Sequence, residues 1–358
     1  MKKQAQNAEL IVMGNQGADL DSISSALVFA WYLAGRQATK IPVALIAVPR
    51  HKLRLRPEAA FVFAAAGINP ENLLFVDDVD LQALVAAGTE IVLVDHNQLA
   101  EDFTNLEHRV TAVIDHHHDG GGFAHAAPRI IEKVGSTATL VAELVLKEDS
   151  AMDSAAARLL LSAILLDTAN LDGKSGRCTK RDQEAALQLL AICGEEQDSF
   201  YQHLNLAQYD LKGLSSQELL GRDYKQWSCP VGRYGMSTVL LSLADWQQRE
   251  AELVKAIAQF ALKKELSVLI VMLASQSPDF QREVILFCRE KGLHDKLAAH
   301  LGKQELDLCS ITEGQEVGGE RGLVSLYSQG NVLMSRKKLQ PIVHCFLAGC
   351  KIPHHSLH

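Results

Sequence analysis

Short, uninterrupted apolar runs alternate with amphipathic segments along the first half of this chain, and this alternation limits the folds that it can adopt. The runs have the length of buried strands and cover residues 10–13, 43–48, 73–76, 91–94 and 110–114. Helical periodicity extends over residues 22–33, 57–66, 137–146, 154–166 and 180–193. Strands that are covered by helices on both faces are apolar throughout. The pattern therefore predicts an α/β domain with a parallel sheet between two layers of helices.

Acidic and imidazole side chains follow three of the predicted strands, at the points where these strands end. Asp19 and Asp21 follow the first run, Asp95 follows the fourth, and the fifth leads into Asp-His-His-His-Asp at residues 115–119. The carboxyl ends of parallel strands meet at one edge of the sheet, where ligands bind in such folds. Because unpaired charge is costly in a core, this grouping favours a metal site over packing.

Each motif also has an ordinary structural interpretation. Asp19 and Asp21 are compatible with an acidic turn before a helix that Ser22 would cap, and residues 116–118 with a solvated loop. Asp167, which follows the apolar segment 159–166, is compatible with a paired carboxylate at a helix end. Together, at one edge of a sheet, the four segments favour a site for two divalent ions. Mixed carboxylate and imidazole ligation suits Mn²⁺, with Mg²⁺ or Co²⁺ as alternatives.

The pattern changes in the second half of the chain, where strands alternate and are expected to pair. Strands are predicted at residues 236–243, 266–273 and 284–288, and helices at residues 245–263 and 293–301. This order is typical of a smaller α+β domain with a mixed sheet. The predicted organisation is a first domain at 1–195, a linker or hinge at 196–214 and a second domain at 215–358.

Composition narrows the classes of partner. The 358-residue chain has a net charge of −8, which argues against a nucleic acid polymer as the partner. No apolar run approaches the roughly 18 residues that a membrane span needs, and the start lacks a secretion signal. The seven scattered cysteines indicate reduced thiols and a cytoplasmic protein. The His-rich end, residues 351–358, is expected to be a frayed terminus. The sequence does not determine an oligomeric state.

The order of these motifs resembles that of the DHH phosphoesterase superfamily: Asp-x-Asp-Ser at 19–22, then Asp95, Asp-His-His at 115–117 and Asp167. The second half resembles a DHHA2 domain. This combination is found in family II inorganic pyrophosphatases, eukaryotic-type exopolyphosphatases and prune-like proteins. The resemblance extends over nearly the whole chain, and it implies that two divalent ions are held by Asp19, Asp21, Asp95, His116 and Asp167, with Asn15 as a weak further ligand.

Asn15 separates the subfamilies. Family II pyrophosphatases are expected to carry a histidine ligand at this point of the first motif, whereas this chain has Gly14-Asn15 followed by Asp19. Exopolyphosphatases and prune-like proteins resemble the chain in having asparagine there. An amide oxygen is a neutral and weaker ligand than imidazole, so one ion would be held less tightly. The departure favours an exopolyphosphatase over a pyrophosphatase.

A basic segment near the C-terminus supplies the expected substrate contacts. Residues 335–338, Ser-Arg-Lys-Lys, resemble the phosphate-binding motif of DHHA2 domains, in which Arg336 would provide a bidentate fork and Lys337 a point charge. Without the resemblance, a solvated basic turn would be the better interpretation. Arg222 and Lys225 also lie in a segment similar to the family, and we assign them no role.

The resemblance implies a metal-dependent exopolyphosphatase that releases terminal phosphate from inorganic polyphosphate. A water activated by two ions would attack phosphorus in line, and Asp115 would orient the histidines. The charge of the leaving group would be met by His117 with Arg336 and Lys337, and His118 would also contact substrate. The alternatives are a manganese-dependent pyrophosphatase, a hydrolase of short polyphosphates or nucleoside tetraphosphates, a prune-like cyclic nucleotide phosphodiesterase and a protein-binding scaffold.

Overall fold

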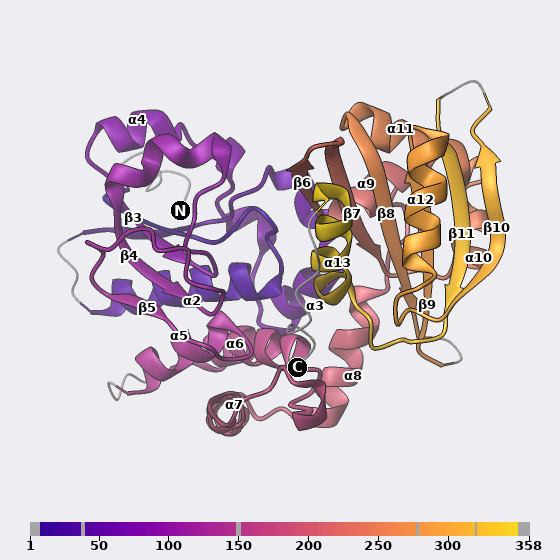
Figure 1. Ribbon diagram of the computed structural model, residues 1–358. Coiled ribbons are helices and arrows are strands. Elements are labelled where there is room, and N and C mark those ends of the chain that lie inside the picture. The colour runs from indigo at the N-terminus through magenta and orange to yellow at the C-terminus, as the bar shows by residue number, and fades with distance from the viewer. Residues whose placement is uncertain (1–7, 37–39, 148–151, 277–278, 319–320, 350–358) are drawn as a thin grey trace. The chain divides into compact units, whose positions relative to one another are not determined.

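The computed structural model describes residues 8–36, 40–147, 152–276, 279–318 and 321–349. The chain forms two compact units, Met1–Asp210 and Leu211–His358, and both are drawn in Figure 1. Each unit has its own apolar core. The His-rich segment 351–358 lies outside the described residues. Within the described part of the chain, no helix is both long and apolar enough to cross a membrane.

The first unit contains a five-stranded sheet in the order β2-β1-β3-β4-β5, and every pair in it is parallel. Its strands are β1 (Leu10–Met13), β2 (Pro42–Leu45), β3 (Glu90–Val94), β4 (Val110–Asp115) and β5 (Arg129–Ile131). Two separate apolar clusters use alternate residues of the same strands, for example Val92 in one and Leu93 in the other. Both faces of the sheet are therefore buried, which confirms the predicted α/β class.

Helices pack against this sheet. They are α2 (Leu20–Gly35), α3 (Pro57–Ala65), α4 (Leu81–Ala86), α5 (Thr137–Leu146), α6 (Ser154–Asp167), α7 (Lys180–Cys193) and α8 (Gln197–Gln208). Single-turn or longer 3₁₀ segments are η1 (Arg50–Leu55), η2 (Pro70–Asn72), η3 (Val76–Asp78), η4 (Glu101–Arg109) and η5 (Gly173–Ser175). In Figure 1 the helices α2, α5 and α6 lie on one side of the strands. Residues of α5 and α6 are buried along most of each helix, and they belong to one apolar cluster of this unit.

The strand predicted at residues 73–76 is wrong. Only Phe75 forms a bridge, to Ile46, and the 3₁₀ segments η2 and η3 lie on either side of it. Asp78 explains the turn, because its carboxylate accepts the Phe75 N–H at 3.1 Å and a bond from Arg50 at 2.5 Å. These side-chain bonds compete with a sheet ladder. The three-residue β5 was missed because so short a run carries no periodicity.

The second unit contains a mixed six-stranded sheet in the order β10-β11-β9-β8-β7-β6, in which only β7 and β8 pair in parallel among the described strands. Its strands are β6 (Tyr224–Cys229), β7 (Gly232–Val239), β8 (Leu266–Ser275), β9 (Gln281–Cys288), β10 (Leu308–Glu316) and β11 (Leu323–Gln329). Its helices are α9 (Ser216–Arg222), α10 (Leu243–Arg249), α11 (Leu253–Lys263), α12 (Lys291–Leu301) and α13 (Arg336–Ala348). The predicted mixed α+β domain is confirmed.

Two local features of the second half differ from the expectation. The single helix predicted at 245–263 is interrupted, because Glu250 leaves the helical conformation and its carboxylate accepts the hydroxyl of Ser216 at 3.1 Å. The predicted linker at 196–214 contains helix α8, whose Phe200 and Leu204 are buried in the core of the first unit. A hinge function for this segment stays a prediction.

Candidate metal centre

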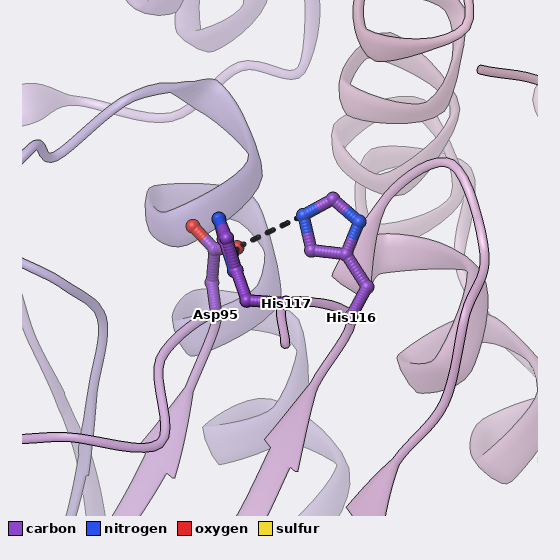
Figure 2. Close-up of side chains that lie close together, drawn as sticks. All are labelled: Asp95, His116 and His117. Carbon is purple, nitrogen blue, oxygen red and sulfur yellow. Dashed lines mark ion pairs between the residues drawn. The ribbon is translucent and has the colours of Figure 1, made fainter. Parts of the chain in front are cut away.

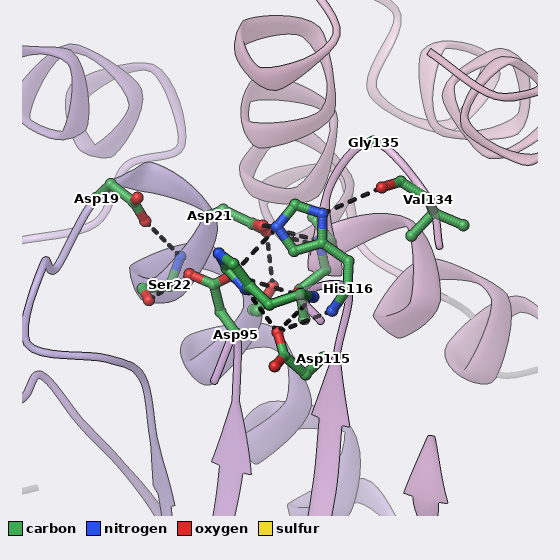
Figure 3. A network of polar contacts seen from close by, with 12 residues as sticks. Asp19, Asp21, Ser22, Asp95, Asp115, His116, Val134 and Gly135 are labelled. Carbon is green, nitrogen blue, oxygen red and sulfur yellow. Dashed lines mark hydrogen bonds and ion pairs between the residues drawn. The ribbon is translucent and has the colours of Figure 1, made fainter. Parts of the chain in front are cut away.

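The carboxyl ends of β1, β3 and β4 bring the predicted polar residues to one edge of the first sheet (Figure 3). Asp95 directly follows β3, and Asp115 is the last residue of β4. Asp19 and Asp21 lie in the short stretch that leads from β1 into α2. The expected convergence of these segments follows from the parallel order of the strands.

The start of α2 shows that the predicted cap at Ser22 is wrong. Asp19 is the N-cap, and its carboxylate accepts the Ser22 N–H at 3.1 Å. A carboxylate at this position also interacts favourably with the helix dipole. Ser22 lies in the first turn, and its hydroxyl is free to donate to Asp95 at 2.6 Å. The Asp-x-Asp-Ser motif therefore connects two strand ends rather than only starting a helix.

Asp21 is buried against the start of another helix. Its two carboxylate oxygens accept the backbone N–H groups of Thr137 and Ala138, both at 2.8 Å. These are the first residues of α5, whose free N–H groups favour an anion. Desolvation by burial nevertheless raises the pKa of Asp21, and the negative charge of Asp19 adds to that effect against the opposing influence of His116.

Asp95 is the central carboxylate of the cluster. It is 2% exposed, and its backbone φ of 63° lies in the left-handed region, which is strained for a residue other than glycine. Its Oδ2 accepts hydrogen bonds from Asn15 Nδ2 at 2.7 Å and from Ser22 Oγ. Burial, and then the charges of Asp21, Asp19 and Asp167, raise the pKa of Asp95 well above its usual range. A cation at this edge would offset that electrostatic cost.

The two histidines that follow β4 face the second oxygen of Asp95. His116 Nε2 and His117 Nδ1 each lie 3.6 Å from Asp95 Oδ1, and His116 Nε2 lies 3.9 Å from Asp21 Oδ2. Figure 2 shows the rings of His116 and His117 close to the carboxylate of Asp95. These distances are too long for hydrogen bonds. Ligand atoms of Asp95, His116 and His117 all lie within 4.8 Å of one another, which is close enough for these side chains to hold a cation.

Asp115 lies behind the histidines and is fully buried. Its Oδ1 accepts the His117 ring Nδ1–H at 2.8 Å and the backbone N–H of His116 at 2.8 Å, while Oδ2 accepts Asn97 Nδ2 at 2.6 Å. Burial would raise the pKa of Asp115, but the bonds and charge of His117 outweigh it and the pKa falls below the usual value. A carboxylate in this state fixes the orientation of the His117 ring.

The remaining predicted site residues are arranged less tightly. Asp167 is the last residue of α6, and Asp19 is exposed. The negative charges of both residues raise the pKa of Asp95. His118 has an exposed side chain, and its backbone carbonyl accepts Asn97 Nδ2 at 3.0 Å. Asn15 directs its Nδ2, rather than its oxygen, to Asp95, because that oxygen accepts the Gly17 N–H at 2.7 Å. Ligation by the Asn15 oxygen stays a prediction.

Three functional contacts were missed from the sequence: Ser22 to Asp95, Thr137 to Asp21 and Asn97 to Asp115. Asn97 had a usable signal, because it follows Asp95 by two residues at a strand end. Thr137 offered none, since its contact depends on where α5 packs.

Two protein-family models and several known proteins match this chain. The model of the DHH family N-terminal domain matches residues 9–164, and the DHHA2 domain model matches residues 202–346. A Schizosaccharomyces pombe protein assigned as an exopolyphosphatase is 33% identical, with 93% of this chain and 89% of that protein covered. The chain belongs to the DHH family and carries a DHHA2 domain.

Other known proteins also match over much of the chain. Exopolyphosphatase PRUNE1 of Rattus norvegicus is 30% identical, covering 93% of this chain and 74% of its own length. A manganese-dependent inorganic pyrophosphatase of Methanocaldococcus jannaschii is 29% identical over 73% of this chain and 81% of its own. A solved Methanococcus jannaschii structure, assigned as a family II inorganic pyrophosphatase, has the same fold with a TM-score of 0.64 at 24% identity, covering 94% of this chain and 99% of its own.

The residues at this edge of the DHH domain fit a hard to borderline divalent metal. They offer buried carboxylates whose pKa values are raised in the absence of a cation, together with imidazole nitrogens held by backbone and carboxylate acceptors. Carboxylate and imidazole donors are those that Mn²⁺ accepts. The DHHA2 domain contains Arg336 and Lys337 in the first turn of α13, where Arg336 pairs with Asp223 at 2.7 Å and Lys337 is exposed.

Proposed function

We propose that this protein is a metal-dependent phosphoanhydride hydrolase that removes terminal phosphate from inorganic polyphosphate. The observation that carries the proposal is the cluster of Asp95, His116 and His117, in which a buried carboxylate with a strongly raised pKa faces two imidazoles at distances too long for hydrogen bonds. The similarity to proteins named as exopolyphosphatases, over most of the chain, supports the same class of substrate.

Two divalent ions, Mn²⁺ in the first place, are proposed to be held by the ligand set Asp19, Asp21, Asp95, His116 and Asp167. When bound, the ions supply positive charge that lowers the pKa of water and neutralises phosphate oxygens. The protein groups prepare the site for this chemistry. Asn15 and Ser22 hold one oxygen of Asp95 and leave the other directed at the histidines. The similarity to a manganese-dependent pyrophosphatase supports the choice of metal.

His117 and Asp115 are proposed to act together on the phosphate. Asp115 accepts the Nδ1–H of His117, and the His117 side chain is 46% exposed, so that it is accessible to a ligand at the surface. A ring held in this way presents its other nitrogen, Nε2, in a fixed direction. Asp115 would stabilise positive charge on the ring when it donates to a phosphate oxygen. His118 is exposed as well, and we propose it as a secondary substrate contact.

The first turn of α13 is proposed to bind phosphate through Arg336 and Lys337. Basic side chains at a helix N-terminus are unfavourable towards the helix dipole unless an anion is present. Ser335, the N-cap, makes no side-chain capping bond: its carbonyl accepts the Lys338 N–H at 3.0 Å, but its hydroxyl satisfies none of the backbone N–H groups of this turn. Both features suit an anionic ligand.

Asn15 favours polyphosphate over pyrophosphate in this proposal, since a neutral amide replaces the imidazole expected in family II pyrophosphatases. The runner-up functions are a pyrophosphatase and a hydrolase of short polyphosphates or nucleoside tetraphosphates. A cytoplasmic location also stays a prediction, because it rests on the cysteine pattern alone.

A substrate panel tests the proposal. Phosphate release is measured from pyrophosphate, tripolyphosphate, long-chain polyphosphate and cyclic AMP, with Mn²⁺ and with Mg²⁺. We expect the highest kcat/KM on polyphosphate with Mn²⁺, and its loss in Asp95→Ala. The matched control is Asp80→Asn, at the exposed N-cap of α4, where asparagine also caps. A preference for pyrophosphate would assign the runner-up, and no turnover of any substrate would contradict an enzymatic role.

A further inference from the structure

A buried carboxylate outside the predicted ligand set is connected to His116 through one peptide group. We propose that Asp182 is a positioning residue that fixes the orientation and the tautomer of His116. The peptide between Val134 and Gly135 transmits the effect, and both residues are drawn in Figure 3. The inference rests on the proposed metal site, because His116 is one of its ligands.

Asp182 belongs to α7, and its carboxylate is fully buried. Both of its oxygens accept the backbone N–H of Gly135, at 3.0 and 2.9 Å. The hydroxyl of Thr139 donates to Oδ1 at 2.6 Å, and the backbone N–H and hydroxyl of Thr179 donate to Oδ2 at 2.7 Å each. A buried charge with this many donors is held rigidly, since moving it would leave several polar groups unsatisfied.

The same peptide group that donates to Asp182 accepts from His116. The carbonyl of Val134 and the N–H of Gly135 belong to one peptide unit, and His116 Nδ1 lies 3.1 Å from that carbonyl oxygen. Because a carbonyl only accepts, the hydrogen of a neutral His116 ring is on Nδ1. The unprotonated Nε2 then faces Asp95 and Asp21. An anion on the N–H side of a peptide polarises it and makes its oxygen a stronger acceptor.

Packing around Gly135 prevents this peptide from rotating away. A Cβ at Gly135 would lie 2.5 Å from Thr168 Cγ2, 2.7 Å from the carbonyl oxygen of Arg177 and 2.9 Å from Asp182 Oδ2. Only glycine fits so close an approach. Thr168 directly follows Asp167, so this packing also connects the peptide that contacts His116 to the end of α6.

The alternative role for Asp182 is purely structural. It is the N3 residue of the capping box at the start of α7, in which Thr179 is the N-cap. That role needs a bond to the Thr179 N–H, which Oδ2 provides. It requires neither the bond to Gly135 nor full burial. Beyond the cap, Asp182 accepts from Gly135, in the segment that precedes α5 and supports His116, and from Thr139 in the first turn of α5.

Asp182→Asn tests the proposal. The asparagine side chain has one acceptor oxygen instead of two, so it cannot accept from all of the groups that donate to Asp182. ¹⁵N NMR of labelled histidine, on metal-free protein at a pH where His116 is neutral, reports the tautomer. We expect the Nδ1–H form in the natural protein and a mixture in the variant. Mn²⁺ affinity, measured by electron paramagnetic resonance, should fall about 10- to 100-fold. Asp153→Asn, at the N-cap of α6, is the matched control and should change neither readout.

The outcomes separate this inference from the proposed function. An unchanged His116 tautomer and unchanged Mn²⁺ affinity in folded Asp182→Asn would overturn the inference while leaving the metal site intact. Natural protein that binds no Mn²⁺ would contradict the proposed site, but the tautomer comparison would still decide the role of Asp182. Should Asp182→Asn fail to fold, hydrogen exchange of the natural protein decides: the Gly135 amide should be protected as strongly as the core of α7, and rapid exchange would overturn the inference.

Discussion

The carboxamide nitrogen of Asn15 lies 2.7 Å from Oδ2 of Asp95 and 3.0 Å from the backbone oxygen of the same residue. One side chain therefore holds both the carboxylate and the strained backbone that carries it. The Asn15 oxygen accepts the Gly17 N–H, so the amide has one favourable orientation. In this geometry Asn15 acts on the site chiefly as a donor to Asp95, and direct contact with a cation would require that orientation to change.

Replacement of Asn15 by alanine should weaken metal binding without unfolding the protein. The variant loses both bonds to Asp95, and removal of such a supporting contact typically costs about 10- to 100-fold in metal affinity. Mn²⁺ affinity measured by isothermal titration calorimetry checks this expectation. Asn105→Ala, at an exposed asparagine that bonds Gln82, is the control. Equal affinity in Asn15→Ala and the natural protein would show that the contact is dispensable.

In the metal-free protein, the contribution of Asp95 to stability should fall as the pH rises. Its pKa is raised in the folded state, so the native protein keeps a proton that the unfolded chain releases above a pKa of about 3.9. The contribution of Asp95 is therefore fully present below that value and is lost as the pH rises towards the folded pKa. Asp95→Asn cannot ionise and avoids this decline. Urea unfolding in the presence of a chelator measures the free energy of unfolding at several pH values. The value for Asp95→Asn, relative to that of the natural protein, should increase as the pH rises.

A constant difference between Asp95→Asn and the natural protein across that range would contradict the raised pKa. Asp80→Asn serves as the control for the change from carboxylate to amide, since Asp80 is an exposed cap. The measurement needs no substrate, so it examines the electrostatics of the site separately from its catalysis.

Mn²⁺ should stabilise the folded protein through its DHH domain. At a free concentration about 100 times the dissociation constant, binding to the native state alone contributes about 2.7 kcal/mol. His116→Ala should lose most of this gain, because it removes an imidazole that faces Asp95 and Asp21. Thermal unfolding with Mn²⁺ or with a chelator measures the shift. His203→Ala, at an exposed residue of α8, should keep the full shift, and an equal shift in His116→Ala would exclude this ring as a ligand.

The sequence predicted the first sheet well because its information is local. Fully apolar strands and the polar residues at their carboxyl ends indicate both a parallel sheet and the edge where Asp95 and residues 115–117 meet. The segment at 73–76 was predicted wrongly because side-chain bonds from Asp78 outweigh its apolar composition.

The supporting contacts of the site were not predictable in the same way. Asp182 is separated from Gly135 by 47 residues, and nothing in its surroundings distinguishes it from an ordinary helix cap. Asn15 was predicted to offer its oxygen to a metal, whereas the orientation of its amide depends on Gly17 and Asp95. Residue types and spacing indicate which side chains gather, but hydrogen-bond directions depend on the packed structure.

Lys337 should contribute to the binding of polyphosphate rather than to chemistry within the DHH domain. It is exposed in the first turn of α13, beside Arg336, which is 10% exposed and already paired with Asp223. Lys337→Ala should therefore raise KM for polyphosphate about tenfold with little change in kcat, the pattern of a lost binding contact. The defect should shrink as ionic strength increases, because salt screens the contribution of an exposed charge. Steady-state kinetics at low and high salt measure both effects.

Lys296→Ala, at an exposed residue of α12 in the same DHHA2 domain, is the matched control. A fall in kcat at unchanged KM would instead assign Lys337 to transition-state stabilisation, and unchanged kinetics in both variants would remove it from the phosphate site.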